Sequence, residues 1–367
     1  MEPLRGIEGL VDNDRLPDLK TVLRLLLGLV VGGAAAWFLL SLWRSGSPGE
    51  RGSSRSEEGE STAERPPADE DQASIAEEAG IDESSRKTLS MGGATPWLEA
   101  AACTHRGKVR DENQDRFVLQ EIPGRKAVVA LVNDGMGGHM GGSVAAEVAA
   151  NTIAEIMKRS EKLDPEGLYE RLAESFERAD LAIRHRASKE TGLGGMGTTG
   201  VAAVVLPDVL IHLHTGDSRL YHYRDGQEIY RTKDHSVVRY LQEEGLVSEA
   251  EARNHPMRSR LTSSLGGSPP ERKVTVEPRW KQGAQEQPAV RDLRPGDVVL
   301  LCSDGLSSEI EPETLDEVVR KHGKKPAQFV REAVKTALDA GGRDNVTVIA
   351  LYVCRSERRP RDPSSAG

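Results

Sequence analysis

The sequence contains few cysteines and few aromatic residues. Its three cysteines, Cys103, Cys302 and Cys354, are odd in number and widely spaced among 367 residues, and no two of them form a CxxC pair. This spacing excludes a disulfide scaffold and the usual cysteine-based zinc sites. With 37% hydrophobic, 4% aromatic and 29% charged residues, the chain is too polar for a protein with many membrane spans and too apolar to be wholly disordered. The net charge of −9 excludes a general nucleic-acid binder.

One long apolar run lies near the N-terminus. Residues 25–43 contain no charged residue and are flanked by Arg24 and Arg44. A helix of nineteen residues is about as long as the ~30 Å hydrocarbon core of a bilayer is thick. A buried soluble helix usually has a polar stripe, and a signal peptide usually ends in an A-x-A site, so the run favours a single transmembrane helix. Gly28 and Gly32 have the GxxxG spacing of a dimerisation face.

The composition changes after this run. Positions 45 to 91 hold 12 acidic and five basic residues, with many serines, glycines and prolines. Such a segment has too few apolar residues to form a core, so it is expected to be an extended, solvated linker. The predicted organisation is an N-terminal tail (1–24), a transmembrane helix (25–43), a disordered acidic linker (44–96), a globular domain (97–354) and a C-terminal tail (355–367).

The globular part combines pairs of strand-like runs with pairs of helical patterns. Apolar runs with the length and composition of strands begin at Ala127, Gly197, Val209, Asp297 and Asn345. The dipeptide Asp225–Gly226 is typical of a β-hairpin turn. A helical pattern places Leu168, Leu172, Phe176 and Leu181 on one face. Because strands are adjacent in pairs, the pattern predicts an α+β fold with antiparallel sheets rather than a parallel one.

Aspartates stand at the ends of several predicted strands. They are Asp115, Asp134, Asp217, Asp304 and Asp344. One such aspartate is usually a turn residue or a helix cap, but five carboxylates at the rim of a core need cations or hydrogen bonds to offset their desolvation. Oxygen ligands without cysteine or paired histidine indicate a hard cation such as Mg²⁺ or Mn²⁺. Gly135, which follows Asp134, leaves a backbone carbonyl free to approach the same ion.

These residues favour phosphate chemistry over other reactions. Two hard cations can activate one water molecule toward phosphorus, and the chain has no GxSxG, CX5R or HExxH motif to supply another nucleophile or metal site. Arg110 can bind a phosphate with two parallel hydrogen bonds. The glycine-rich run from Gly192 precedes a strand and has Thr198 where a P-loop needs lysine, which excludes a nucleotide loop. His212 and His214 alternate on a strand and are more typical of a core than of a metal site.

Seven motifs resemble, in sequence order, those of the metal-dependent protein phosphatases (PPM, or type 2C), and most closely the bacterial branch. They are RDENQD (110–115), DGMGGHMGG (134–142), GMGTT (195–199), GDSRLY (216–221), KDHSVV (233–238), SDGL (303–306) and GGRDNVTV (341–348). The resemblance covers residues 97–354. It implies an αββα sandwich of two antiparallel sheets flanked by helix pairs. It also implies hydrolysis of phosphoserine and phosphothreonine by in-line attack of a hydroxide that bridges two Mn²⁺ or Mg²⁺ ions.

The resemblance also implies a role for each matching residue. By this resemblance, Arg110 binds phosphate and Asp115 holds metal-bound water. Asp134 bridges both metals, the Gly135 carbonyl ligates one of them, and Asp304 and Asp344 complete the shell of the second. Asp217 shares a third, weaker site with Asp304, and Asn345 orients the last carboxylate. Met136 stands where some relatives have a histidine. The general acid is therefore left open between His139 and a metal-bound water.

The sequence as a whole predicts a membrane-tethered protein serine/threonine phosphatase. Its expected partners are phosphoserine and phosphothreonine proteins, including membrane kinases and their substrates. A single-pass location in the cell membrane with the catalytic domain in the cytoplasm fits free thiols and phosphoprotein substrates. Two alternatives remain: a metal-poor pseudophosphatase that acts as an adaptor, and a phosphatase dedicated to one regulatory phosphoprotein. The intact set of aspartates favours the active enzyme over the adaptor.

Overall fold

The computed structural model describes residues 86–91, 97–138, 140–160, 164–267, 273–285 and 288–354. None of the helices within these ranges has the length and apolar character needed to cross a membrane. The predicted transmembrane run 25–43, with Gly28 and Gly32, lies outside the described residues, as do both predicted tails and most of the predicted linker.

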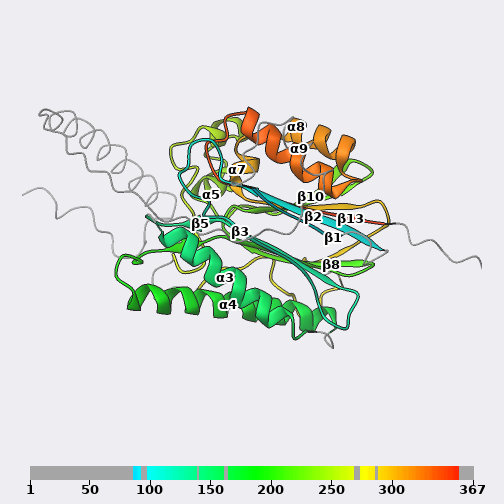
Figure 1. Ribbon diagram of the computed structural model, residues 1–367, viewed down its shortest axis with the longest axis horizontal. Helices are drawn as coiled ribbons and strands as arrows, with labels where there is room; N and C mark the ends of the chain where they lie inside the picture. The colour runs from blue at the N-terminus through cyan, green and yellow to red at the C-terminus, as the bar shows by residue number, and fades with distance from the viewer. Residues whose placement is uncertain are drawn as a thin grey trace, which may run out of the picture. The chain divides into compact units, whose positions relative to one another are not determined.

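Two antiparallel sheets form the centre of the fold (Figure 1). The six-stranded sheet has the order β1 (Arg86–Met91), β2 (Leu98–His105), β13 (Val346–Val353), β12 (Val298–Cys302), β9 (Arg219–Arg224) and β10 (Gln227–Arg231). The five-stranded sheet has the order β11 (Val290–Asp292), β8 (Val209–Thr215), β7 (Gly200–Val205), β4 (Val128–Asn133) and β3 (Arg116–Glu121). A small third sheet pairs β5 (Gly135–Met136) with β6 (Gly197–Thr198). The antiparallel pairing throughout confirms the predicted α+β class.

Helix pairs cover the outer faces of both sheets (Figure 1). The helices α3 (Gly141–Met157) and α4 (Pro165–Lys189) pack on the five-stranded sheet through one apolar cluster. The helices α8 (Pro312–His322) and α9 (Pro326–Asp339) pack on the six-stranded sheet through a second cluster. A third cluster fills the space between the two sheets. The layers are therefore helix, sheet, sheet and helix. The shorter helices α5 (Val237–Glu243), α6 (Glu249–Arg253) and α7 (Asp304–Ser307) complete the described fold.

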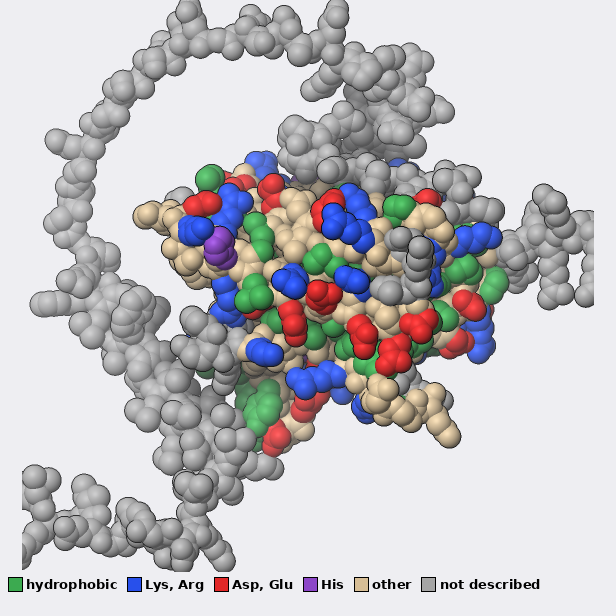
Figure 2. Space-filling model, turned by 90° about the horizontal axis from the view of Figure 1, so that it is seen from below, with side chains coloured by type: hydrophobic (Ala, Val, Ile, Leu, Met, Phe, Trp, Pro, Cys, Tyr) green, Lys and Arg blue, Asp and Glu red, His purple; other side chains and the backbone are tan. Residues whose placement is uncertain are grey.

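Helix α4 shows how local sequence sets these layers. Its first turn begins at Pro165, and the Asp164 carboxylate accepts a hydrogen bond from the Gly167 N–H, which caps the helix. The buried stripe runs through Leu168, Leu172, Phe176, Ala179 and Ile183. The predicted inward position of Leu181 is wrong: its side chain is 60% exposed, because the 3.6-residue period places the neighbours two positions away on the buried face. On the face shown in Figure 2, acidic and basic side chains are interspersed with scattered hydrophobic ones, as on an ordinary solvated surface.

The predicted linker is wrong at residues 86–91, which form the edge strand β1. This strand pairs with β2 over its whole length, from Arg86 opposite His105 to Met91 opposite Ala100. The prediction followed from the shortage of apolar residues, which precludes a core. Backbone pairing with the free edge of β2 needs no core, since the backbone groups themselves form the bonds.

Two smaller predictions are confirmed. Asp225 and Gly226 have φ angles of 52° and 75° and join β9 to β10 as a hairpin turn. His212 and His214 are buried, and the ring of His212 lies 4.9 Å from that of Tyr230. Both histidines are therefore core residues.

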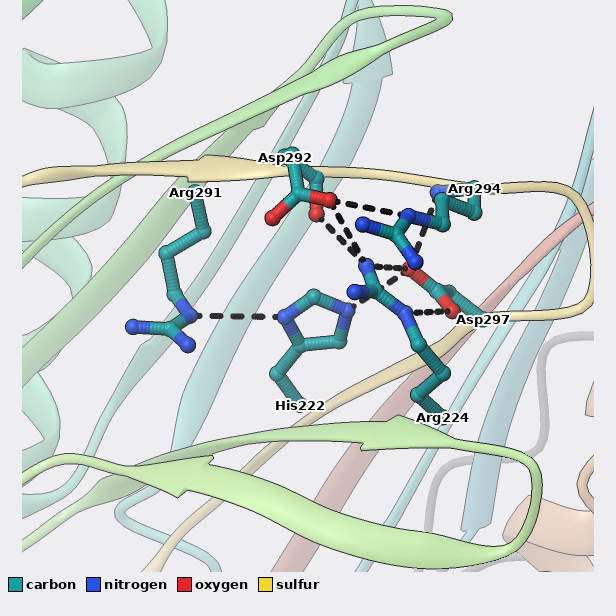
Figure 3. Close-up of polar contacts among 6 residues, drawn as sticks. All are labelled: His222, Arg224, Arg291, Asp292, Arg294 and Asp297. Carbon is teal, nitrogen blue, oxygen red and sulfur yellow. Dashed lines mark hydrogen bonds and ion pairs between the residues drawn. The ribbon is translucent and has the colours of Figure 1, made fainter.

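A buried polar cluster joins the two sheets (Figure 3). The Asp297 carboxylate, just before β12, accepts hydrogen bonds from His222 Nε2 at 2.9 Å and from Arg224 Nε and Nη2 at 2.9 and 2.8 Å, all from β9. On β11, Arg291 Nε donates to His222 Nδ1 at 3.4 Å. Burial raises the pKa of Asp297, but these hydrogen bonds outweigh burial and hold that pKa below its ordinary value. The cluster therefore holds an ionised carboxylate between the sheets.

Candidate active site

The five aspartates singled out in the sequence come together at one edge of the sandwich. Asp134 lies between β4 and β5, Asp217 in the turn between β8 and β9, and Asp304 at the start of α7. Asp115 and Asp344 lie just before β3 and β13. Burial raises the pKa of Asp134 well above its ordinary value, and the charges of Asp115, Asp304 and Asp217 raise it further. The strands of both sheets thus bring their carboxylates to one edge of the sandwich, as the resemblance implied.

Two threonines hold the backbone of Asp134 in place. The Asp134 carbonyl accepts hydrogen bonds from Thr198 Oγ1 at 2.8 Å and from the Thr199 N–H at 2.9 Å, and the Asp134 N–H donates to Thr199 Oγ1 at 3.0 Å. Thr199 Oγ1 also lies 2.7 Å from the hydroxyl of Ser218, beside Asp217. Only glycine fits at position 135, since a Cβ there would come within 2.2 Å of the Gly142 carbonyl oxygen.

Asp115 is a buried carboxylate with one satisfied oxygen. Its Oδ2 accepts a hydrogen bond from Ser303 Oγ at 2.8 Å, and Ser303 Oγ accepts one from the Thr347 N–H at 3.0 Å. Its Oδ1 is buried and accepts no hydrogen bond from the described residues. Burial raises the pKa of Asp115 to about 7. An ionised Asp115 would therefore need a further positive charge or donor at Oδ1.

Arg110 lies at the exposed rim of the carboxylates. Its Nη2 donates to Asp344 Oδ2 at 2.7 Å, and its side chain is 56% exposed. Asn345 fixes the loop that carries Arg110: Oδ1 accepts from the Gln114 N–H at 2.8 Å, and Nδ2 donates to the carbonyls of Arg106 and Glu112 at 2.7 and 2.8 Å. The Asn345 N–H also donates to Asp344 Oδ1 at 2.8 Å. An anion bound by Arg110 would thus lie directly beside the aspartates.

A partly buried ion pair supports the Asp217 side of the site. Arg219 donates to both carboxylate oxygens of Asp234, from Nε at 2.8 Å and from Nη2 at 2.7 Å. Burial and neighbouring carboxylates raise the pKa values of Asp217 and Asp304 above the ordinary value, and the positive charge of Arg219 lowers them only in part. The two arginines of this edge, Arg110 and Arg219, cannot neutralise so many carboxylates.

The residues of this edge fit hard divalent cations. Within the described ranges, no three acidic, histidine or cysteine side chains are arranged around a single point as a closed cage. Mg²⁺ and Mn²⁺ do not need such a cage, because they commonly bind one or two carboxylates and keep several water ligands. The orphaned Asp115 Oδ1 and the raised pKa values at Asp134 and Asp304 mark a site with too little positive charge. A donor set made only of oxygen atoms selects hard ions.

The charged residues of the site were predicted from the sequence, but the residues that hold them in place were not. The structure brings together Arg110, Asp115, Asp134, Asp217, Asp304 and Asp344, with Gly135 beside Asp134. His139, the predicted candidate for the general acid, lies outside the described residues. The supports that were missed are Thr198, Thr199, Ser218, Ser303 and the Arg219–Asp234 pair. All of them lie inside or next to the quoted motifs, which was the one signal that could have indicated them.

Comparison with known proteins gives a consistent result. The family model described as "Protein phosphatase 2C" matches residues 103–344. The serine/threonine protein phosphatase PstP of Mycobacterium tuberculosis is 34% identical over 278 residues, which are 76% of this chain and 49% of PstP. The serine/threonine phosphatase stp of Listeria monocytogenes is 33% identical over 255 residues, 69% of this chain and 95% of that protein. The chain therefore spans about half the length of one of these relatives and nearly all of the other.

Solved structures share the fold. The crystal structure of M. tuberculosis PstP/Ppp has a TM-score of 0.58 at 33% identity, and the match covers 71% of this chain and all of that one. A catalytic domain of PstP in complex with two manganese ions has a TM-score of 0.56 at 31% identity, covering 71% of this chain and 99% of that one. Together with the site geometry, these matches show that the chain belongs to the protein phosphatase 2C family.

Proposed function

We propose that this chain is a protein serine/threonine phosphatase that hydrolyses phosphoserine and phosphothreonine with the help of two Mn²⁺ or Mg²⁺ ions. The observation that carries the proposal is the gathering of five aspartates beside an exposed arginine, at one edge of two sheets. Such a concentration of negative charge is costly unless cations bind there. The names of the similar proteins and the manganese in one similar structure support the same activity.

The metal ions would be held by side-chain and backbone oxygens. Asp134 would contact both ions, the Gly135 carbonyl one of them, and Asp304 and Asp344 the second. Asp217 would bind a third, weaker ion together with Asp304. When bound, a pair of such ions supplies Lewis-acid activation of a water molecule and neutralises charge on the phosphoryl group.

The chain itself would orient the substrate and the water. Arg110 would bind the phosphoryl oxygens. Its guanidinium is exposed, and its Nη2 atom lies 2.7 Å from Asp344 Oδ2, which places it beside the carboxylates of the site. Asp115 Oδ1, which accepts no hydrogen bond from the described residues, would accept one from water in the site. The threonine clamp on Asp134 would keep the carboxylates fixed during the reaction, which lowers the cost of reorganisation. The general acid stays open between His139 and a metal-bound water.

We also propose that residues 25–43 anchor the chain in the cell membrane, with the catalytic domain in the cytoplasm. The support is the uncharged apolar run and the polar composition of the residues after it. With β1 beginning at Arg86, about 40 linker residues would let the domain reach about 35 Å from its anchor. This reach would favour membrane kinases and their substrates as partners. Dimerisation through Gly28 and Gly32 stays a prediction.

The activity is tested with the full-length chain in detergent. Hydrolysis of p-nitrophenyl phosphate and of a phosphothreonine peptide is measured with Mn²⁺, Mg²⁺ or EDTA, for the wild type, for Asp304→Asn and for the control Asp339→Asn on the exposed end of α9. Turnover should require metal, be lost in Asp304→Asn and be normal in Asp339→Asn. A folded protein with no turnover in any metal would favour the adaptor alternative.

A further inference from the structure

The loop that carries Arg110 presents a row of cations at the rim of the site. Arg106, Lys108 and Arg110 alternate along the sequence, and all three are exposed. Val109, between two of them, is 65% exposed. The residues that follow Arg110 are the exposed acids Asp111 and Glu112. Along the sequence, the loop is therefore positively charged before Arg110 and negatively charged directly after it.

This loop is held firmly against the loop that carries Asp344. The Lys108 N–H donates to the Gly342 carbonyl at 2.7 Å, and Asn345 Nδ2 donates to the Arg106 carbonyl at 2.7 Å. Gly107 has a φ of +84°, and a Cβ there would lie 2.2 Å from the Asp344 carbonyl oxygen. Two backbone contacts and a close glycine approach thus fix Lys108 beside the site, which limits the entropy lost when a ligand binds.

The cations of this rim differ in their partners. Arg110 pairs with Asp344, and Arg343 pairs with Glu309, whose side chain is only 5% exposed. Among the described residues, no carboxylate forms an ion pair with Lys108, and the guanidinium of Arg106 donates to a backbone carbonyl, that of Asp111, at 3.4 Å. The charges of Lys108 and Arg106 are therefore available to a bound ligand.

We propose that Lys108 and Arg106 form a subsite for an anionic group that flanks the phosphorylated residue of a protein substrate. The inference rests on the proposed phosphatase function and adds a substrate preference to it. The Cα atoms of Lys108 and Arg110 are at most about 7 Å apart, because only Val109 lies between them and each extended step spans at most about 3.6 Å. An extended peptide advances about 3.4 Å per residue, so a side chain two to four residues from the phosphoresidue lies within reach of Lys108.

The ligand is defined by its chemistry as an anion on one flank of the phosphoresidue. A glutamate or aspartate and a second phosphorylated residue both supply it. The acids Asp111 and Glu112 would repel the same group on the other flank, so the preference depends on the side that carries the charge. Because the subsite is exposed, its contribution falls as ionic strength rises.

The test compares matched phosphothreonine peptides on the full-length chain with Mn²⁺. The peptides carry alanines, glutamates on the N-terminal flank, glutamates on the C-terminal flank, or a second phosphothreonine on either flank. The variants are Lys108→Glu, Arg106→Glu, and Lys335→Glu, a control on the exposed surface of α9. Relative to the alanine peptide, negative charge on one flank should raise kcat/KM by up to about fivefold per charge, chiefly by lowering KM. Lys108→Glu should reverse this preference. Lys335→Glu should keep it.

Two results would overturn the subsite. The first is a wild-type enzyme whose kcat/KM values for neutral and acidic peptides are equal at low salt. The second is a Lys108→Glu, Arg106→Glu double variant that keeps the wild-type preference. Comparison of kcat/KM between the glutamate peptides and the peptides with a second phosphothreonine shows which of the two anionic groups the subsite prefers. Turnover of p-nitrophenyl phosphate reports the proposed phosphatase function separately, and fluorescence anisotropy of labelled peptides measures the same preference as binding if turnover is absent.

Discussion

The side chain of Asn345 should contribute to both the stability and the substrate affinity of the domain. Its three side-chain hydrogen bonds, to the Gln114 N–H and to the carbonyls of Arg106 and Glu112, measure 2.7 to 2.8 Å. The residue is 6% exposed, so Asn345→Ala leaves these backbone groups poorly solvated. At about 1 kcal/mol per bond, the free energy of unfolding should fall by about 3 kcal/mol. In urea this corresponds to a fall of about 1 M in the unfolding midpoint.

The assay compares urea unfolding of the wild type, Asn345→Ala and Asn254→Ala, an exposed asparagine at the end of α6. The control should stay within about 0.5 kcal/mol of the wild type. Under native conditions, Asn345→Ala should also raise KM for a phosphopeptide, since the loop carrying Arg110 loses its anchor. Unfolding of Asn345→Ala at the same urea concentration as the control would show that the three bonds do not hold the loop.

Three further predictions concern other parts of the fold. Asp297→Ala leaves Arg224 and His222 without their acceptor and should lower stability by about 3–5 kcal/mol, and an unchanged melting temperature would contradict this. Burial lowers the pKa of His212 to about 3, so the unfolded chain binds more protons below pH 6.5, and the stability contributed by this residue should fall by about 1.4 kcal/mol per pH unit on acidification. Urea midpoints measured from pH 7 to pH 5 should therefore fall less steeply in His212→Asn than in the wild type. An identical pH dependence would contradict this role of His212. Ser303→Ala should weaken Mn²⁺ affinity by about tenfold through the loss of its bond to Asp115, and wild-type affinity in calorimetry would show that the bond is not needed.

The carboxylates of the site could be predicted because local sequence marks the ends of buried strands. Asp134 and Asp304 each follow a run of apolar residues, and such runs identify strands without knowledge of their partners. That the aspartates of both sheets share one edge followed from the resemblance to a known family, since strand order cannot be read from periodicity alone. The antiparallel class followed from the adjacent pairing of strands.

The supports of the site could not be predicted, because they depend on contacts between distant segments. Thr199 meets Asp134 across 65 positions, and Ser303 meets Asp115 across 188. Hydroxyl groups carry no periodic signal, so only the folded strands reveal which carboxylate each one serves. Strand β1 was missed for a related reason: its pairing depends on the free edge of β2 and on no pattern of its own.

The metal centre is tested most sharply by a calorimetric Mn²⁺ titration of the full-length chain at neutral pH, beside Asp134→Asn. Asp134 lies among the other carboxylates and is the residue assigned to contact both ions. About two ions should bind per wild-type chain, and this binding should be lost in Asp134→Asn. Equal binding by the wild type and the variant, or no binding by a folded wild-type chain, would contradict the claim that this edge is a metal centre.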